Sequence, residues 1–383
     1  MGKGNKKRTG KKSQNVATNR QQHPSGLPFV SVCTPTFNRR PFILHMIKCF
    51  QSQDYPKELL EWIIIDDGTD KIGDLVKDIP EVKYFSYNKK MVLGEKRNLM
   101  HKKATGDILV YMDDDDFYPP ERISHAVERL MTNPEALCAG SSEIYIYFKH
   151  INKLYQFGPY GPNHSTAGTF AFKRQLLEQT SYEDNAALAE EKAFLKNYTI
   201  PFVQLDPIKT ILVFSHEHNT FDKRKLLVNP HPNFVKESDK TVDMFIADSQ
   251  MRKFYMEDIE ELLKDYEPGK PSMKPDVLKQ MIEIEENRRK HAESVAQQLS
   301  HQGQIIMQQK DGSSKAMTSQ DIIKLLQHQH NTINELISRL RERDNEINML
   351  KAMMSEQTKD ETKEQINIES KMKILLSQIN NYN

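Results

Sequence analysis

The segment DILVYMDDDDFYPP, residues 107–120, joins an apolar run to four consecutive aspartates. Residues 108–112 are apolar without interruption, as expected of a strand that is buried on both faces of a parallel sheet. Ligands bind such sheets at the edge formed by the carboxyl ends of the strands, where this run is expected to lie. In a polar tail, four aspartates would be a solvated charge run. Directly after a buried strand, they indicate a ligand site.

Four neighbouring carboxylates repel one another unless a cation screens them or raised pKa values neutralise some of them. Hard oxygen ligands suit Mg²⁺ or Mn²⁺, and such an ion can bridge the phosphates of a nucleotide. The run therefore predicts a divalent metal site. Asp66 and Asp67 follow the apolar run WIII at 62–65 and are expected at the same edge. Their alternative is an ordinary Asp-Asp-Gly turn.

Short apolar runs alternate with amphipathic stretches around these segments, which is typical of an α/β domain with a largely parallel sheet. Strands are expected at 29–34, 62–65, 82–85, 107–112, 136–140, 202–205 and 211–214, and helices at 95–103, after 120 to about 131, and at 186–196. An antiparallel hairpin of 144–148 with 154–157 is expected to extend the same sheet. The second half of the domain is therefore mixed.

Four motifs resemble, in order, those of family 2 glycosyltransferases of GT-A fold. They are the strand and loop VSVCTPTFNR at 30–39, IDDGT at 65–69, GEKRN at 94–98 and the DXD block at 111–119. In the third motif, Lys96 replaces the small residue of the family pattern. The resemblance covers about half of the chain and implies a GT-A nucleotide-diphospho-sugar transferase fold, with a Rossmann-like mixed sheet, over residues 28–225.

The resemblance also implies the roles of individual residues. The nucleotide-sugar donor would be bound by Pro35, Thr36, Asn38, Arg39, Asp66, Asp67, Arg97, Asn98, Asp113 and Asp114. The metal, Mn²⁺ or Mg²⁺, would be bound by Asp115, with Asp114 and Asp116 in contention because four aspartates allow a shift of one residue. His216, three residues before Asn219, matches a His-x-x-Asn segment whose histidine reaches the metal or diphosphate. The alternative for His216 is a histidine-rich surface turn.

An inverting transfer needs a base that removes the proton of the acceptor hydroxyl. Glu190 and Glu191 resemble the Glu-Asp pair of the family, and Glu191 stands in the Asp position. The alternative is a solvated pair at a helix start, where acidic residues are favoured by the helix dipole. The sequence leaves these two interpretations open.

The predicted activity is an inverting, metal-dependent transfer of a sugar from a nucleotide diphosphate, UDP in the first instance, to a hydroxyl of a glycan, protein or lipid-linked acceptor. A nucleotidyltransferase of the same fold is disfavoured, since the glycine-rich phosphate loop expected near its first strand is absent. An inactive domain that serves as a scaffold on a coiled coil is the alternative from another class.

The rest of the chain differs in composition from the domain. We expect a disordered basic arm at 1–27, a connecting region at 226–275, a helical or disordered linker at 276–319 and a coiled coil at 320–383. The heptad a positions are Leu326, Ile333, Leu340, Ile347 and Met354, and the d positions are Ile322, Gln329, Leu336, Arg343 and Leu350. This pattern predicts a homo-oligomer, and its alternative is a single helix that lies on the domain.

Charge and cysteine content limit the partners and the compartment. The 54 Lys and Arg residues nearly balance the 53 Asp and Glu residues, so nucleic acid is not an expected partner. Cys33, Cys49 and Cys138 are too few and too dispersed for a disulfide framework, which favours a reducing compartment. No signal peptide is recognised and no uncharged run approaches the ~20 residues of a membrane span, so we expect a cytoplasmic protein.

Overall fold

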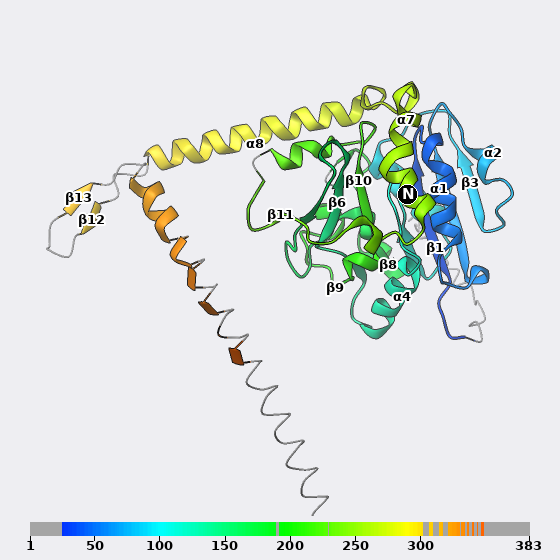
Figure 1. Cartoon of the computed structure of the whole chain (residues 1–383), viewed down its shortest axis with the longest axis horizontal. Helices are drawn as coiled ribbons and strands as arrows, with labels where there is room; N and C mark the ends of the chain where they lie inside the picture. Colours follow the sequence, from blue (N-terminus) through cyan, green and yellow to red (C-terminus); the bar gives the residue numbers. More distant parts are fainter. Residues whose placement is uncertain are drawn as a thin grey trace, which may run out of the picture. The chain divides into compact units, whose positions relative to one another are not determined.

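The computed structural model describes residues 25–188, 191–228 and 230–301, together with short stretches between 306 and 347. The chain divides into two compact units, Met1–Arg288 and Arg289–Asn383. The first unit carries the candidate site and is an α/β domain with two sheets (Figure 1).

A seven-stranded mixed sheet forms the centre of the first unit, in the order β3-β2-β1-β4-β8-β5-β9. Its strands are β1 (Val30–Thr36), β2 (Leu60–Asp66), β3 (Val82–Ser86), β4 (Ile108–Tyr111), β5 (Cys138–Gly140), β8 (Ala171–Lys173) and β9 (Phe202–Gln204). The first four in the order are parallel, whereas β8 runs antiparallel to both β4 and β5. The predicted mixed sheet is confirmed. Of the strands in this sheet, β8 alone lacked a prediction.

Both faces of this sheet are buried, and successive side chains of β2 enter different cores. Trp62 and Ile64 belong to one apolar cluster, with side chains of α1 (Arg40–Gln51) and α4 (Arg122–Thr132). Ile63 and Ile65 belong to a second cluster, to which α3 (Leu93–Lys103) contributes. The two-residue repeat of a strand therefore explains why WIII is apolar throughout.

The predicted hairpin exists as β6 (Ile144–Phe148) and β7 (Lys153–Phe157), but the expectation that it extends the main sheet is wrong. It lies in a second sheet of order β10-β6-β7-β11, with β10 (Leu212–Ser215) and β11 (Val235–Glu237). β10 pairs in parallel with β6. Hairpin patterns fix the local pairing of two strands, whereas the choice of sheet depends on partners far away in the chain.

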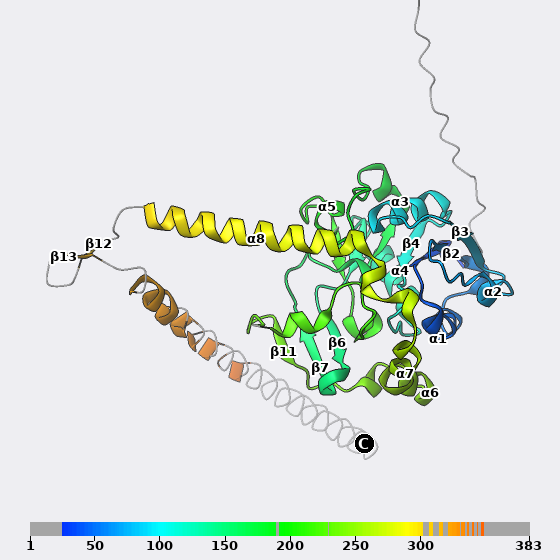
Figure 2. The same ribbon diagram turned by 90° about the horizontal axis from the view of Figure 1, so that it is seen from above.

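Residues beyond 225 also contribute to the core of the first unit. α6 (Ser249–Lys253), α7 (Ile259–Lys264) and the short helical turns around them bury Phe245, Ile246, Phe254, Tyr255 and Leu263. α7 lies beside α1 (Figure 2). The domain boundary expected at residue 225 therefore falls inside this compact unit.

Two further helical predictions differ from the structure. Of the described residues between 186 and 196, those of α5 (Glu191–Phe194) are helical, and residues 186–188 are irregular. The segment 276–319 begins as helix α8 (Pro275–His301), and a short hairpin of β12 (Ile306–Gln308) and β13 (Ser314–Ala316) follows.

The described parts of 321–347 are helical, and the heptad side chains of Leu326, Ile333, Leu336, Leu340 and Ile347 are exposed. Met354 and Leu350 lie outside the described residues, as does the arm before residue 25. Among the described helices, none is both long and apolar enough to cross a membrane.

Candidate active site

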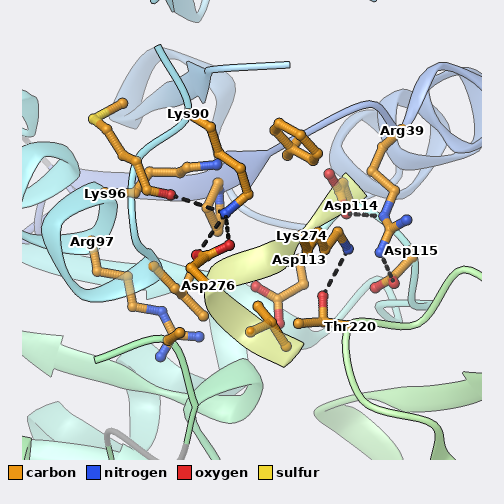
Figure 3. Close-up of a pocket in the computed structure, with 16 residues that line it drawn as sticks. Arg39, Lys90, Lys96, Arg97, Asp113, Asp114, Asp115, Thr220, Lys274 and Asp276 are labelled. Carbon is orange, nitrogen blue, oxygen red and sulfur yellow. Dashed lines mark hydrogen bonds and ion pairs between the residues drawn. The ribbon is translucent and has the colours of Figure 1, made fainter. Parts of the chain in front are cut away.

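A small pocket lies at the carboxyl ends of β1 and β4. It is lined by Pro35, Phe37, Arg39, Lys90, Met91, Leu93, Lys96, Arg97, Asp113, Asp114, Asp115, Ala187, Thr220, Lys274, Asp276 and Val277 (Figure 3). The predicted strand edge is thus where the structure places the acidic run. The volume of the pocket is about 140 Å³, which is below the roughly 300–1,000 Å³ of typical ligand pockets.

Parallel pairing of β1 with β4 brings the first motif to the acidic run. Cys33 is in register with Tyr111, so the loop that follows β1 faces the loop that follows β4. The hydroxyl of Thr34 donates to the carbonyl of Met112 at 2.7 Å. As a result Arg39, at the end of the first loop, reaches the aspartates, 76 residues away in the chain.

Arg39 supplies the cation that the acidic run needs. Its Nε lies 3.5 Å from Oδ1 of Asp114 and its Nη2 lies 3.3 Å from Oδ2 of Asp115. On the other side, Nε2 of His216 lies 3.3 Å from the same oxygen of Asp115. A divalent metal was expected to relieve the repulsion within the run. Here a guanidinium already relieves part of it.

Burial and neighbouring charges shift the pKa values of the aspartates in different directions. Desolvation, opposed by Arg39 and reinforced by Asp115, raises the pKa of Asp114 to about 7. Burial would also raise the pKa of Asp115, but Arg39 and His216 outweigh it and hold this pKa well below its usual range. Burial and the charge of Asp115 raise the pKa of Asp116 well above its usual value. Of these three aspartates, Asp115 therefore keeps its negative charge most readily, whereas burial disfavours the charge of Asp114 and Asp116.

Asp116 does not line the pocket. Its Oδ1 accepts a hydrogen bond from the backbone N–H of Phe214 at 3.2 Å, and its own carbonyl accepts one from the hydroxyl of Tyr255 at 2.9 Å. It therefore connects the aspartate loop with β10 and the helices beyond residue 245. Of the predicted metal ligands, Asp115 lies at the pocket, and His216 lies behind it, buried, with Nε2 2.7 Å from Nδ2 of Asn219.

Asp67 is held in a buried ion pair that the sequence did not predict. Its Oδ1 pairs with Nζ of Lys96, and its Oδ2 accepts the backbone N–H of Met91 at 2.6 Å. Lys96 also donates to the carbonyl of Thr36 at 3.1 Å. The lysine that departs from the family pattern therefore connects α3 with the loops after β1 and β2. It also places a cation on the pocket wall.

Three other predicted donor-binding residues organise loops. Oδ1 of Asp66 accepts the N–H of Gly68, and its Oδ2 accepts the hydroxyl of Tyr84 at 2.6 Å. Asn38, at a positive φ of 53°, accepts the N–H groups of Thr69 and Asp70 through Oδ1. Asn98 does not line the pocket. Its Nδ2 donates to the carbonyl of Tyr182, and its Oδ1 accepts the backbone N–H of the same residue. Pro35, Arg39 and Arg97 line the pocket as predicted.

Glu191, the candidate base, approaches the pocket through a short turn of residues 167–169. Its Oε1 accepts the backbone N–H of Ala167 at 3.2 Å. The hydroxyl of Tyr118 donates to the carbonyl of Gly168 at 3.2 Å and accepts the N–H of Asp113 at 2.7 Å. The turn thus connects Glu191 with Asp113. Glu190 lies outside the described residues.

The donor atoms of the pocket fit a cation that also binds a ligand. Within the described part of the chain, no group of three or more His, Cys, Asp or Glu side chains forms a ready metal cage. Mg²⁺ is usually held by one or two carboxylates together with substrate phosphates and water. Asp113 and Asp115 line one pocket, and Oδ2 of Asp114 is buried without a hydrogen-bond partner in the described residues. A bound cation would share Asp115 with Arg39 and His216, or displace them.

Four polar or charged pocket residues carried no signal in the sequence. They are Lys90, Thr220, Lys274 and Asp276. Nζ of Lys90 lies 2.6 Å from both carboxylate oxygens of Asp276, and Nζ of Lys274 donates to Oγ1 of Thr220 at 3.0 Å. Two of them come from the segment after residue 265. Only its Pro- and Gly-rich composition sets that segment apart in the sequence.

Comparison with known proteins identifies the domain. Residues 31–188 match the sequence model of Glycosyl transferase family 2. The GalNAc(5)-diNAcBac-PP-undecaprenol beta-1,3-glucosyltransferase of Campylobacter jejuni is 34% identical over 111 residues, which are 27% of this chain and 34% of that protein. A Methanococcus voltae dolichyl N-acetyl-alpha-D-glucosaminyl phosphate 3-beta-D-2,3-diacetamido-2,3-dideoxy-beta-D-glucuronosyltransferase is 35% identical over 89 residues, 21% of this chain and 27% of that protein.

Among solved structures, the mannosyltransferase PcManGT from Pyrobaculum calidifontis, in complex with GDP-Man and Mn²⁺, superposes with a TM-score of 0.41 and 19% identity. The match covers 54% of this chain and 61% of that one. The aligned part of this chain spans about a third or less of the length of the two curated relatives.

Proposed function

Residues 31–188 belong to glycosyl transferase family 2, and on this premise we propose that the chain transfers a sugar from a nucleoside diphosphate donor to a hydroxyl acceptor. One observation carries the proposal. Asp113, Asp114 and Asp115 share a pocket with Arg39 and several other cations at the carboxyl edge of a mixed sheet. Such a set can hold both a cation and the charged diphosphate of a leaving nucleotide. UDP is the nucleotide that we propose first.

The residues around the pocket divide into two groups. Arg39, Arg97 and Asp113 contact the donor, because their side chains line the cavity. Thr36, Asn38, Asp66, Asp67 and Asn98 act through the loops that they fix, since their polar atoms bond to backbone or to neighbouring side chains. The raised pKa values of Asp114 and Asp116 lessen the repulsion that the charge of Asp115 meets.

A divalent cation, Mn²⁺ or Mg²⁺, would be held by Asp115 with Asp113 beside it, and would neutralise charge that develops on the leaving diphosphate. Glu191 would accept the proton of the acceptor hydroxyl while that oxygen forms its bond to the anomeric carbon. The bond from the anomeric carbon to the diphosphate oxygen breaks as the new bond forms, and the diphosphate leaves with the electron pair. Attack from the opposite face inverts the anomeric configuration.

Residues 320–383 are proposed to join copies of the chain through a coiled coil. The exposed Leu326, Ile333, Leu336 and Leu340 support this, because an apolar heptad pattern on an exposed helix needs a partner. Light scattering on the chain with and without 320–383 tests the proposal. A monomer in both cases would contradict it.

Calorimetry with UDP and Mn²⁺, together with assays of UDP-sugar hydrolysis, tests the catalytic proposal. Asp115→Ala should abolish metal-dependent UDP binding and hydrolysis, while Asp239→Ala, on the exposed surface, should change neither. Unchanged activity in Asp115→Ala would refute the site. The alternative of an inactive scaffold rests on the Glu191 departure from the family pattern, and it predicts no metal-dependent heat in the unaltered protein.

A further inference from the structure

A segment that we call the strap, residues 266–277, crosses the candidate pocket. The carbonyl of Pro268 accepts Nδ2 of Asn38 at 2.7 Å, and the carbonyl of Gly269 accepts Nη1 of Arg39 at 3.5 Å. These contacts join residues 230 positions apart in the chain. The strap therefore lies directly on the loop that carries the first family motif.

The far end of the strap is fastened to the other side of the pocket. Asp276 pairs with Lys90, and Oε1 of Gln280, one turn beyond, accepts the N–H groups of Ala187 and Leu188 at 2.8 and 2.6 Å. Figure 3 shows Asp276 in contact with Lys90, and Lys274 in contact with Thr220. The strap thus spans the pocket from the Arg39 side to the residues that precede Glu191.

Lys274, on the strap, is a buried cation whose surroundings differ from those of its neighbours. Lys274 is only 5% exposed. Arg39, Lys90 and Lys96 each have a carboxylate at ion-pair distance. Lys274 has none among the described residues, and its Nζ bonds only to the neutral hydroxyl of Thr220.

A buried ammonium with one neutral partner costs free energy, because burial removes water that a hydroxyl replaces only in part. Burial, with the nearby charge of Arg39, accordingly lowers the pKa of Lys274 well below its usual value, against the attraction of Asp115 and Asp114. An anion that enters the pocket would supply the missing counter-charge. The position of Lys274 is therefore suited to a ligand rather than to the stability of the empty domain.

We propose that Lys274 binds the diphosphate of the donor, and that the strap is a lid that opens to admit the nucleotide and closes to bring this lysine onto it. The small pocket, about 140 Å³, is the closed form. Lysine is a well-suited phosphate ligand as a compact positive charge. This inference rests on the proposed function for the nature of the donor, but its anion chemistry can be tested separately.

Titration calorimetry at fixed Mg²⁺ with UDP, uridine and inorganic pyrophosphate separates the contributions. Lys274→Met should weaken binding of UDP and pyrophosphate roughly tenfold or more and leave uridine unchanged. Lys274→Arg should restore part of the loss. Lys279→Met is the matched control, since this lysine lies on α8, five residues after Lys274, but its side chain is 81% exposed, and the variant should bind all three ligands as the unaltered protein does.

Thermal unfolding supplies a second measurement. Because the empty site is not stabilised by a paired Lys274, Lys274→Met should unfold at the same temperature as the unaltered protein or higher, yet gain less from added UDP. A purely structural lysine would instead lower the unfolding temperature without ligand.

The outcomes distinguish the two proposals. Equal loss of UDP and uridine affinity in Lys274→Met, or no loss at all, overturns the role of Lys274 and leaves the proposed function standing. If the unaltered protein binds pyrophosphate through Lys274 but not UDP, the anion site holds and the proposed donor is wrong. If it binds neither, both fail.

Discussion

The buried pair of Asp67 and Lys96 gives the sharpest prediction about stability. The two residues are 2% and 5% exposed, so neither charge has water to replace a lost partner. Asp67→Asn leaves Lys96 without a charged partner, because the new amide oxygen and the carbonyl of Thr36 are both neutral acceptors, and Lys96→Met leaves Asp67 with only the N–H of Met91. Each single change should therefore cost about 3–5 kcal/mol of unfolding free energy, as expected when one partner of a buried pair is removed.

The double variant Asp67→Asn with Lys96→Met removes both charges, and the cost should fall to about 1–2 kcal/mol, because no uncompensated charge remains. The coupling energy of the cycle is then at least ~4 kcal/mol in magnitude. Urea unfolding followed by fluorescence measures it well, because Trp62 is the single tryptophan and lies buried on β2, next to the loop that carries Asp67.

The exposed pair of Lys253 and Asp258 is the matched control. Its side chains are 59% and 43% exposed, so the same two substitutions there should show no measurable coupling. If the Asp67 and Lys96 changes add within ~0.5 kcal/mol, the pair does not stabilise the domain as the structure implies.

Three further changes test separate parts of the domain. The Nη2 of Arg122 donates to the carbonyls of Tyr111, Thr169 and Phe170, so Arg122→Met should cost about 3–5 kcal/mol in urea unfolding; a cost near zero would contradict this. Burial lowers the pKa of His101 from 6.5 to about 3, so its unfolded form binds more protons below pH 6.5. Unfolding free energy should then fall by about 1.4 kcal/mol per pH unit from pH 6.5 towards 3, and it should fall less steeply in His101→Phe. A Cβ on Gly269 would lie 2.7 Å from the Asn38 carbonyl oxygen, so Gly269→Ala should displace the strap and weaken UDP binding, while Gly161→Ala, which meets nothing within 4 Å, should not.

Much of the fold followed from local patterns. Residues such as 62–65 and 108–112 are apolar throughout because both faces of their sheet are covered, and this is legible in the chain itself. The position of Asp113–Asp116 at the carboxyl edge of the sheet was predicted because these residues directly follow such an apolar strand. Hairpin β6–β7 was predicted as a pair but assigned to the wrong sheet, because its partner β10 lies more than fifty residues further along.

The assignment of charges within the site was decided only by tertiary structure. The sequence determined that carboxylates would gather at the carboxyl edge of the sheet, near the loop that ends in Arg39. Packing decided that Arg39 pairs with Asp114 and Asp115, and that Lys274 enters the pocket from beyond the expected domain. The physical reason is that strand and turn patterns record local hydrogen bonding and burial. Electrostatic partners are instead chosen by distance in space, which joins residues up to 230 positions apart.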